Sequence, residues 1–138
     1  MEILGRVRPG RSYASTVMPL CSDELSRVLP FTPYPGTLNL HLHQPIALKN
    51  GTSWQGPDDG HERMLVPARL DAVDVYINRW SNCPYYRVDV MAPCKLREFL
   101  NLHDDSLVRL SIDDRYLDRR PAKAFIQFAV HRLRGLVV

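Results

Sequence analysis

The chain has 138 residues, 45% of them hydrophobic, with a formal net charge of +3 and a sequence pI of ≈ 8.9. This length allows one hydrophobic core, so we predict a single domain over residues 1–138. The mild positive charge suits phosphate-bearing ligands and argues against nucleic acid as the main partner.

Cysteine usage and apolar patterning indicate the compartment. Cys21, Cys83 and Cys94 are an odd number without CxxC spacing, which predicts neither a disulfide framework nor a zinc site. No apolar stretch approaches the roughly 20 residues that a membrane helix needs, and the N-terminus lacks the pattern of a signal peptide. We therefore expect a cytoplasmic protein with reduced thiols and no membrane partner.

The first third of the chain alternates between strand, turn and helix signals. Residues 2–8 predict a first strand, and residues 8–13, with Gly10 at their centre, predict a loop or a plain hairpin turn. Residues 22–24 (Ser-Asp-Glu) are typical of a helix start, and the helix is expected to continue through Leu25, Val28 and Leu29.

A rigid turn at residues 33–37 leads into the next strand. Two prolines and Gly36 stiffen this turn, and the strand beyond it alternates apolar and polar residues, with Leu38, Leu40 and Leu42 on one face. Thr37 and Asn39 then share the opposite face. Two neutral oxygens there suit a Mg2+ ion whose other ligands are water and phosphate oxygens; an ordinary polar turn is the alternative.

The remaining elements favour an all-β architecture. Residues 47–62 are polar and rich in Gly and Pro and predict a mobile loop, whereas strand patterns follow at residues 65–77, 85–90 and 107–112. Several strands, few long helices and no βαβ alternation favour a small closed or nearly closed barrel, which we assign to residues 1–115.

Residues 116–138 are predicted to form a C-terminal helical extension. Pro121 can open a helix whose apolar positions recur at helical spacing, and its other face is basic. We expect this helix to pack against the barrel or against a second copy of the chain, which would make a homo-oligomer. A basic face for another partner or for nucleic acid is the alternative.

A second motif lies at residues 91–102, where a strand turns through Pro93 into a short helix. Lys95 and Arg97 then stand at a strand-to-helix corner, where free backbone N–H groups and two cations can meet an anion. A solvated helix start is the alternative.

The turn Pro-Tyr-Pro-Gly-Thr-Leu-Asn (residues 33–39) and the corner Ala-Pro-Cys-Lys-Leu-Arg-Glu (residues 92–98) together resemble the archaeal CTP-dependent riboflavin kinase family. The resemblance runs from about Gly5 to Ile112. It implies a mainly β fold, a six-stranded barrel of the cradle-loop type with short helices, and an enzyme that phosphorylates riboflavin to FMN with CTP and Mg2+.

The resemblance also implies which residues bind each ligand. It assigns the metal to Thr37 and Asn39 and the flavin to Ser81 and Asp89, with Trp80, Tyr85 and Tyr86 either beside the flavin ring or in the core. It assigns the nucleotide to Gly10, Arg11, Ser12, Lys95, Leu96, Arg97 and Glu98. The glycine-rich loop is several residues shorter than the family pattern, so Arg8 is a candidate to replace the missing amides.

Two other functions stay open at this stage. Ser81 and Asp89 are smaller than the residues that the family pattern has there, which suggests a CTP-dependent kinase for another small alcohol. Barrels of related topology bind DNA without catalysis. Thr37, Asn39 and the string from Lys95 to Glu98 argue against DNA binding, because a DNA-binding barrel has no use for them.

Overall fold

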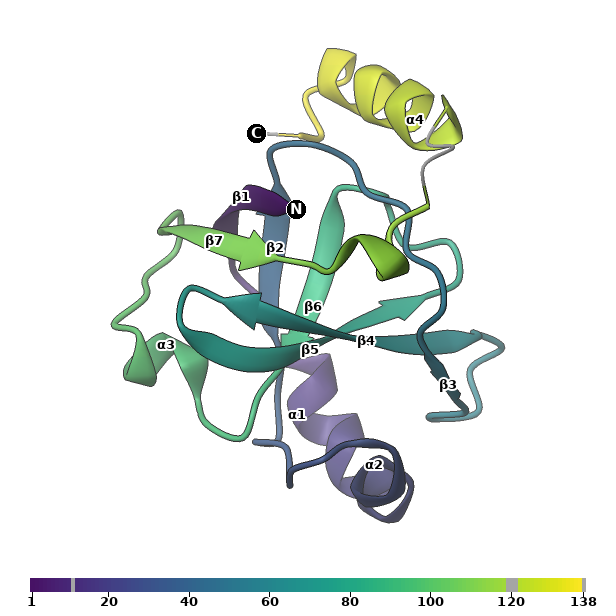
Figure 1. Cartoon of the computed structure of the whole chain (residues 1–138), viewed down its shortest axis with the longest axis vertical. Helices are drawn as coiled ribbons and strands as arrows, with labels where there is room; N and C mark the ends of the chain where they lie inside the picture. Colours follow the sequence, from purple (N-terminus) through teal and green to yellow (C-terminus); the bar gives the residue numbers. More distant parts are fainter. Residues whose placement is uncertain (11, 119–121, 138) are drawn as a thin grey trace.

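Seven antiparallel strands form one sheet that closes on itself (Figure 1). The structure is a computed structural model, and it describes residues 1–10, 12–118 and 122–137. The strand order is β3-β4-β5-β6-β2-β1-β7, and β4 also pairs with β7. Because β3 pairs only with β4, the other six strands make the closed barrel. This confirms the predicted mainly β fold with a six-stranded barrel, short helices and a C-terminal helix.

The strands and helices have the following bounds. The strands are β1 (Glu2–Arg8), β2 (Leu38–Leu42), β3 (Thr52–Trp54), β4 (Arg63–Leu70), β5 (Val73–Trp80), β6 (Arg87–Met91) and β7 (Leu107–Ser111). The α-helices are α1 (Tyr13–Val17), α2 (Ser22–Val28), α3 (Leu96–Phe99) and α4 (Ala122–Leu133), with short 3-10 turns η1 (Met18–Cys21) and η2 (Asp114–Tyr116).

The barrel interior is filled by the apolar face of each strand. Leu40, Val88 and Ile77 lie on three neighbouring strands and are fully buried, at 0% exposure each. Burying such a side chain contributes about 1.5–3 kcal/mol relative to leaving it in water. The alternation that fills the interior sends every second residue of β2, β6 and β5 to the outer face of the barrel.

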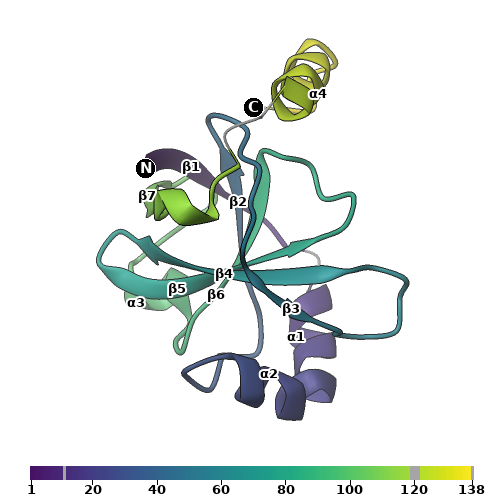
Figure 2. The same cartoon turned by 45° about the vertical axis from the view of Figure 1, so that its right-hand side comes forward.

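A second apolar cluster covers part of that outer face. Met18 of η1 and Leu25 of α2 pack with Trp54, Leu65 and Met91 of the sheet. Figures 1 and 2 show α1 and α2 together at one end of the molecule, beside β3. The helix α1, the turn η1 and the outer sheet face become the two walls of the site.

Several local predictions of element type or boundary are wrong. The hairpin-turn alternative for the segment after β1 is wrong, because β1 ends at Arg8 and α1 begins at Tyr13, directly after Ser12, which is in the left-handed region at φ 60°. The segment at residues 65–77 is two strands, since a turn at Asp71 (φ 51°) divides it. The predicted loop at residues 47–62 contains β3, and Leu29 is extended rather than helical.

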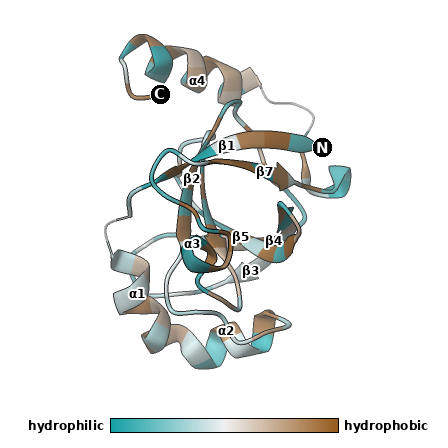
Figure 3. Ribbon diagram, turned by 90° about the vertical axis from the view of Figure 1, so that its left-hand side faces the viewer, coloured by the Kyte–Doolittle hydropathy of each residue, from teal (hydrophilic) through white to brown (hydrophobic). Residues whose placement is uncertain are grey.

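The helix α4 lies against the end of the barrel opposite α1 and α2 (Figure 3). The backbone N–H of Tyr85 donates to Gln127 Oε1 at 2.9 Å, and the ring of Tyr86 meets Phe128 and His131 edge to face. Packing of this helix against the barrel is therefore confirmed; Pro121, predicted to open it, lies outside the described residues. None of the described helices has the length and apolar character that a bilayer crossing requires.

Candidate functional site

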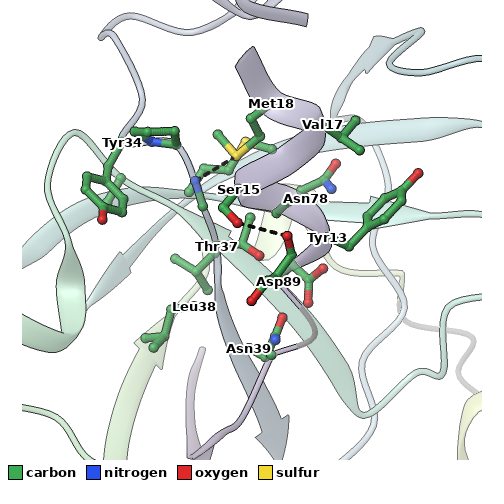
Figure 4. A pocket seen from close by; sticks show the side chains of 18 of the residues that line it. Tyr13, Ser15, Val17, Met18, Tyr34, Thr37, Leu38, Asn39, Asn78 and Asp89 are labelled. Atoms are coloured by element: carbon green, nitrogen blue, oxygen red, sulfur yellow. Dashed lines mark hydrogen bonds between the residues drawn. The ribbon is translucent and has the colours of Figure 1, made fainter. Parts of the chain in front are cut away.

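A cavity of ≈ 1160 Å³ lies between the outer face of the barrel and the first helices. Its floor comes from β2, β6 and β5, and its opposite wall from α1, η1 and the turn at residues 34–37. Figure 4 shows side chains of both walls in this cavity, with Asn39 and Asp89 from the sheet, Thr37 from the turn before β2, and Tyr13 and Ser15 from α1. Residues from both sequence motifs meet here.

The turn before β2 is tied down at both of its ends. Gly36 has φ +147°, within the region that favours glycine, and its N–H donates to Met18 Sδ at 3.2 Å. The N–H of Tyr34 donates to the carbonyl of Ala92 at 2.8 Å. Both Thr37 and Asn39, the predicted metal ligands, line the cavity beyond this turn.

The loop after β1 lies directly against Asn39. A Cβ on Gly10 would stand 2.6 Å from Asn39 Nδ2, so a larger residue there would push the Asn39 amide aside. Ser12 also lines the cavity, and its carbonyl accepts hydrogen bonds from Ser15 Oγ at 2.8 Å and Thr16 Oγ1 at 3.1 Å. Arg11 lies outside the described residues.

The corner at α3 forms another edge of the cavity. Lys95, Leu96 and Arg97 line it, whereas Glu98 points to solvent and pairs with Lys95 Nζ at 3.2 Å. Arg97 Nη2 donates to Asp104 at 2.8 Å and to the carbonyl of Arg8 at 3.2 Å, which ties the corner to the end of β1.

The side chain of Arg8 has a partner of its own. It forms an ion pair with Asp105 at 2.8 Å and is not among the cavity-lining residues. The nucleotide role that we considered for Arg8 therefore finds no support in its position.

A polar row crosses the cavity floor on three adjacent strands. Asn39 on β2 is directly opposite Asp89 on β6, and Asp89 is directly opposite Asn78 on β5. Asp89 Oδ1 is buried and has no hydrogen-bond partner among the described residues, and the nearest cation, Arg87 Nε, is 4.0 Å away. Burial raises the pKa of Asp89 to about 6, against the opposing influence of Arg87 and Arg79.

Asn78 is held in one orientation by an indole. Trp54 Nε1 donates to Asn78 Oδ1 at 3.0 Å, and both residues are 8% exposed. The guanidinium of Arg63 lies over the Trp54 ring at 5.7 Å and donates to the carbonyl of Gln55 at 3.1 Å. Arg63 also pairs with Asp59, and this hydrogen bond lowers the pKa of Asp59 to about 2.

The second residue predicted to bind flavin lies next to the cavity lining but is not part of it. Ser81 Oγ accepts from the N–H of Glu62 at 3.2 Å and lies 3.1 Å from His61 Nδ1, and Ser81 is not among the lining residues. Of the three aromatic candidates, Trp80 lines the cavity, with the Arg87 guanidinium 5.2 Å from its ring centroid. Tyr86 is 5% exposed beneath α4 and belongs to the core, and Tyr85 does not line the cavity.

Sequence reasoning missed Asn78, Trp54, Tyr13 and Arg63 as lining residues. Asn78 reaches the row only because the β5–β6 register sets it opposite Asp89, and one sequence does not specify that register. The one available signal was the polar residue itself, since Asn78 lies between Tyr76 and Trp80 at alternate positions of the strand.

The oxygen donors near Asn39 fit a magnesium ion. Within the part of the chain that the structure describes, no group of three or more His, Cys, Asp or Glu side chains could hold a metal. The hydroxyl of Thr37 and the amide oxygen of Asn39 are instead hard donors of the kind that Mg2+ takes alongside water and phosphate oxygens.

Comparison with known proteins places the chain in a family. It is 26% identical over 125 residues to a riboflavin kinase from Methanococcus aeolicus, covering 80% of this chain and 98% of that protein. It is 27% identical over 124 residues to a riboflavin kinase from Pyrococcus abyssi, covering 80% of this chain and 56% of the relative.

A family model for the CTP-dependent riboflavin kinase domain, described as the domain of unknown function DUF120, matches residues 7–112. Because this match covers most of the chain, the protein belongs to the CTP-dependent riboflavin kinase family.

Proposed function

We propose that this chain transfers the γ-phosphoryl group of CTP to the terminal ribityl hydroxyl of riboflavin, giving FMN and CDP. The observation that carries the proposal is that Gly10, Asn39 and Lys95 line the same cavity as the polar row on β6 and β5. The cavity has room for a second substrate beside the nucleotide. The names of the two relatives and of the family support the choice of substrates. The three cysteines are free thiols, which supports a cytoplasmic location.

The nucleotide end of the cavity supplies positioning and positive charge. Phosphoryl transfer requires little covalent chemistry from the protein, so the alignment of the phosphates and the neutralisation of their charge matter most. In this proposal the backbone near Gly10 and Ser12 approaches the phosphates closely, and Lys95 and Arg97 supply cations. Lys95 is the freer of the two, because its exposed pair with Glu98 is worth only about 0–1 kcal/mol.

Thr37 and Asn39 would hold the metal. A bound Mg2+ would neutralise charge on the β- and γ-phosphate oxygens. The chain itself keeps both donors in place, because the Gly36–Met18 hydrogen bond fixes the turn and the contact of Gly10 with Asn39 limits where that amide can move.

The acceptor end orients the attacking hydroxyl. As its oxygen bonds to the γ-phosphorus, the bond from that phosphorus to the bridging oxygen breaks, CDP leaves with the electron pair, and the hydroxyl proton is released. Asp89, buried and unpartnered at Oδ1, accepts a hydrogen bond from the acceptor in this arrangement.

The direct test measures FMN formation from riboflavin with Mg2+ and either CTP or ATP, using chromatography. We expect FMN with CTP and much less with ATP. Folded protein that forms no FMN with any nucleotide and metal combination would overturn the proposal. A matched panel of other small alcohols with CTP tests the alternative acceptor, which the position of Ser81 outside the cavity lining keeps open.

The proposal includes a second copy of this chain as the partner of α4. Four large apolar side chains of the helix remain exposed, with Phe125 at 52%, Ile126 at 65%, Val130 at 39% and Leu133 at 90%. Sedimentation velocity tests this part separately: a dimer that Ile126→Lys converts to monomer supports it, and a monomeric wild-type protein rejects it.

A further inference from the structure

We propose that Asn78 is a substrate-binding residue that, together with Asp89, recognises a polyol chain, and that Trp54 positions Asn78 for this contact. The ligand class is the ribityl chain of a flavin, so the inference rests on the proposed function and specifies how the acceptor is bound.

The distance of Asp89 and Asn78 from Asn39 indicates that these two residues contact the polyol and not the flavin ring. Adjacent strands are about 4.8 Å apart, so the row places Asp89 one strand and Asn78 two strands from Asn39. Since the attacking hydroxyl must reach the phosphate near Asn39, the groups next to Asn39 meet the hydroxyl end of the acceptor. An extended five-carbon chain spans about one strand spacing, so a chain that starts beside Asn39 brings its further hydroxyls to Asp89 and toward the Asn78 side chain, and the ring extends beyond them.

The hydrogen-bonding capacity of the row matches a chain of hydroxyls. Trp54 Nε1 occupies Asn78 Oδ1, so Asn78 offers its Nδ2 donors to the cavity. Asp89 offers an acceptor, because its Oδ1 has no hydrogen-bond partner among the described residues. Each hydroxyl both donates and accepts, so one donor beside one acceptor can satisfy neighbouring hydroxyls. Figure 4 shows Asp89 lying between Asn39 and Asn78.

The burial of Asn78 makes the contact selective. Asn78 is 8% exposed, so few water molecules can reach Nδ2. A bound ligand that offers Nδ2 no acceptor also excludes this water, and the donor is then left without a hydrogen bond. A site built to hydrogen-bond a hydroxyl discriminates strongly against an analogue that lacks it.

The ring has a separate surface beyond the row. Trp80 lies two residues after Asn78 on the same face of β5, and the Arg87 guanidinium is 5.2 Å from its ring centroid. A flat aromatic ring fits this pair, whereas a polyol gains little from it. The two ends of the acceptor are thus bound by different residues, which makes them separable by experiment.

The experiment titrates wild-type protein and two variants with riboflavin and with lumiflavin, which has a methyl group in place of the ribityl chain. Flavin fluorescence in the absence of nucleotide reports affinity. Asn78→Leu keeps a similar size and removes the donors, and Trp54→Phe removes the indole N–H together with part of the ring. Asp74→Asn, on an exposed part of the same strand, is the matched control.

We expect Asn78→Leu to weaken riboflavin binding roughly tenfold while lumiflavin affinity changes less than twofold. Trp54→Phe should show a smaller loss of the same kind, and Asp74→Asn none. Equal losses for both flavins in a variant of unchanged melting temperature would assign Asn78 a structural role and overturn the inference. Unchanged riboflavin affinity in Asn78→Leu would also overturn it.

The proposed function is judged by a different readout. Wild-type protein that forms FMN while Asn78→Leu fails to separate the two flavins refutes the inference alone. Wild-type protein that binds neither flavin and forms no FMN refutes the proposed function and the inference together.

Discussion

Asn39 and Asp89 lie directly opposite each other on the neighbouring strands β2 and β6, on the face of the barrel that points into the cavity. One is a neutral oxygen donor that belongs to the first motif. The other is an acid whose Oδ1 is buried and without a partner. In the proposed function this pair marks the boundary between the two substrates.

The first prediction concerns Asn39→Ala. Losing the amide oxygen should remove most kinase activity, because one of two protein ligands to the metal is gone, while riboflavin affinity stays within about twofold. Activity across a Mg2+ titration and flavin fluorescence measure the two effects. Wild-type activity at limiting Mg2+ in the variant would show that the turn is only structural.

The second prediction concerns Gly10→Ala. The new Cβ would meet Asn39 Nδ2 at 2.6 Å, and the flexible amide rather than the backbone would have to move. We therefore expect a several-fold loss of activity at limiting Mg2+ with little change in melting temperature.

A double-mutant cycle tests the coupling. In an Asn39→Ala background, Gly10→Ala should have almost no further effect, because the amide that it displaces is absent. Additive losses in the double variant would mean that Gly10 acts independently of Asn39.

The third prediction compares two cations. Lys95→Ala should weaken CTP binding roughly tenfold, since charge-assisted hydrogen bonds are worth about 1.5–3 kcal/mol. Arg8→Ala should change CTP affinity less than twofold, because Arg8 is paired with Asp105 outside the cavity lining. Calorimetric titration of CTP into each variant checks the contrast, and equal losses would contradict it.

The fourth prediction concerns pH and the stability of the metal-free protein. The pKa of Asp89 rises from 3.8 to about 6 on folding, because burial disfavours its charge. The folded state therefore holds this proton more tightly, so the stability from Asp89 is fully present below pH 3.8 and is lost as pH rises through about 6. The loss amounts to about 2–3 kcal/mol at about 1.4 kcal/mol for each pKa unit.

Asp89→Asn removes this dependence. In a chelator, its melting temperature should exceed that of the wild type by several degrees at pH 8, and the difference should shrink toward pH 4. Thermal melts at matched ionic strength decide the matter. A difference that does not vary with pH would show that Asp89 carries no raised pKa.

The sequence predicted those parts of the protein that depend on local pattern. The bounds of β1 were predicted to the residue, and the leucines at 38, 40 and 42 face the core as their spacing requires. Both motifs predicted cavity-lining residues, including Thr37, Asn39 and Lys95.

Features set by tertiary contacts were beyond such reasoning. Helix α1 is five residues long with no buried residue and no capping side chain, so its sequence lacks the usual helix signals. Strand β3 is defined by its pairing with β4, where Trp54 lies opposite Arg63 and its indole reaches Asn78. Asn78 becomes part of the site through strand register, which only the folded barrel defines.

The closure of the barrel also determines when the protein can become folded during its synthesis. Strand β1 lies between β2 and β7, and Glu2 is paired with Ser111. A ribosome makes β1 first, yet one edge of that strand stays unpaired until β7 has emerged. The β4 edge near Leu70 waits for the same strand. Until then the nascent chain exposes two open strand edges, which favours protection by chaperones over early independent folding.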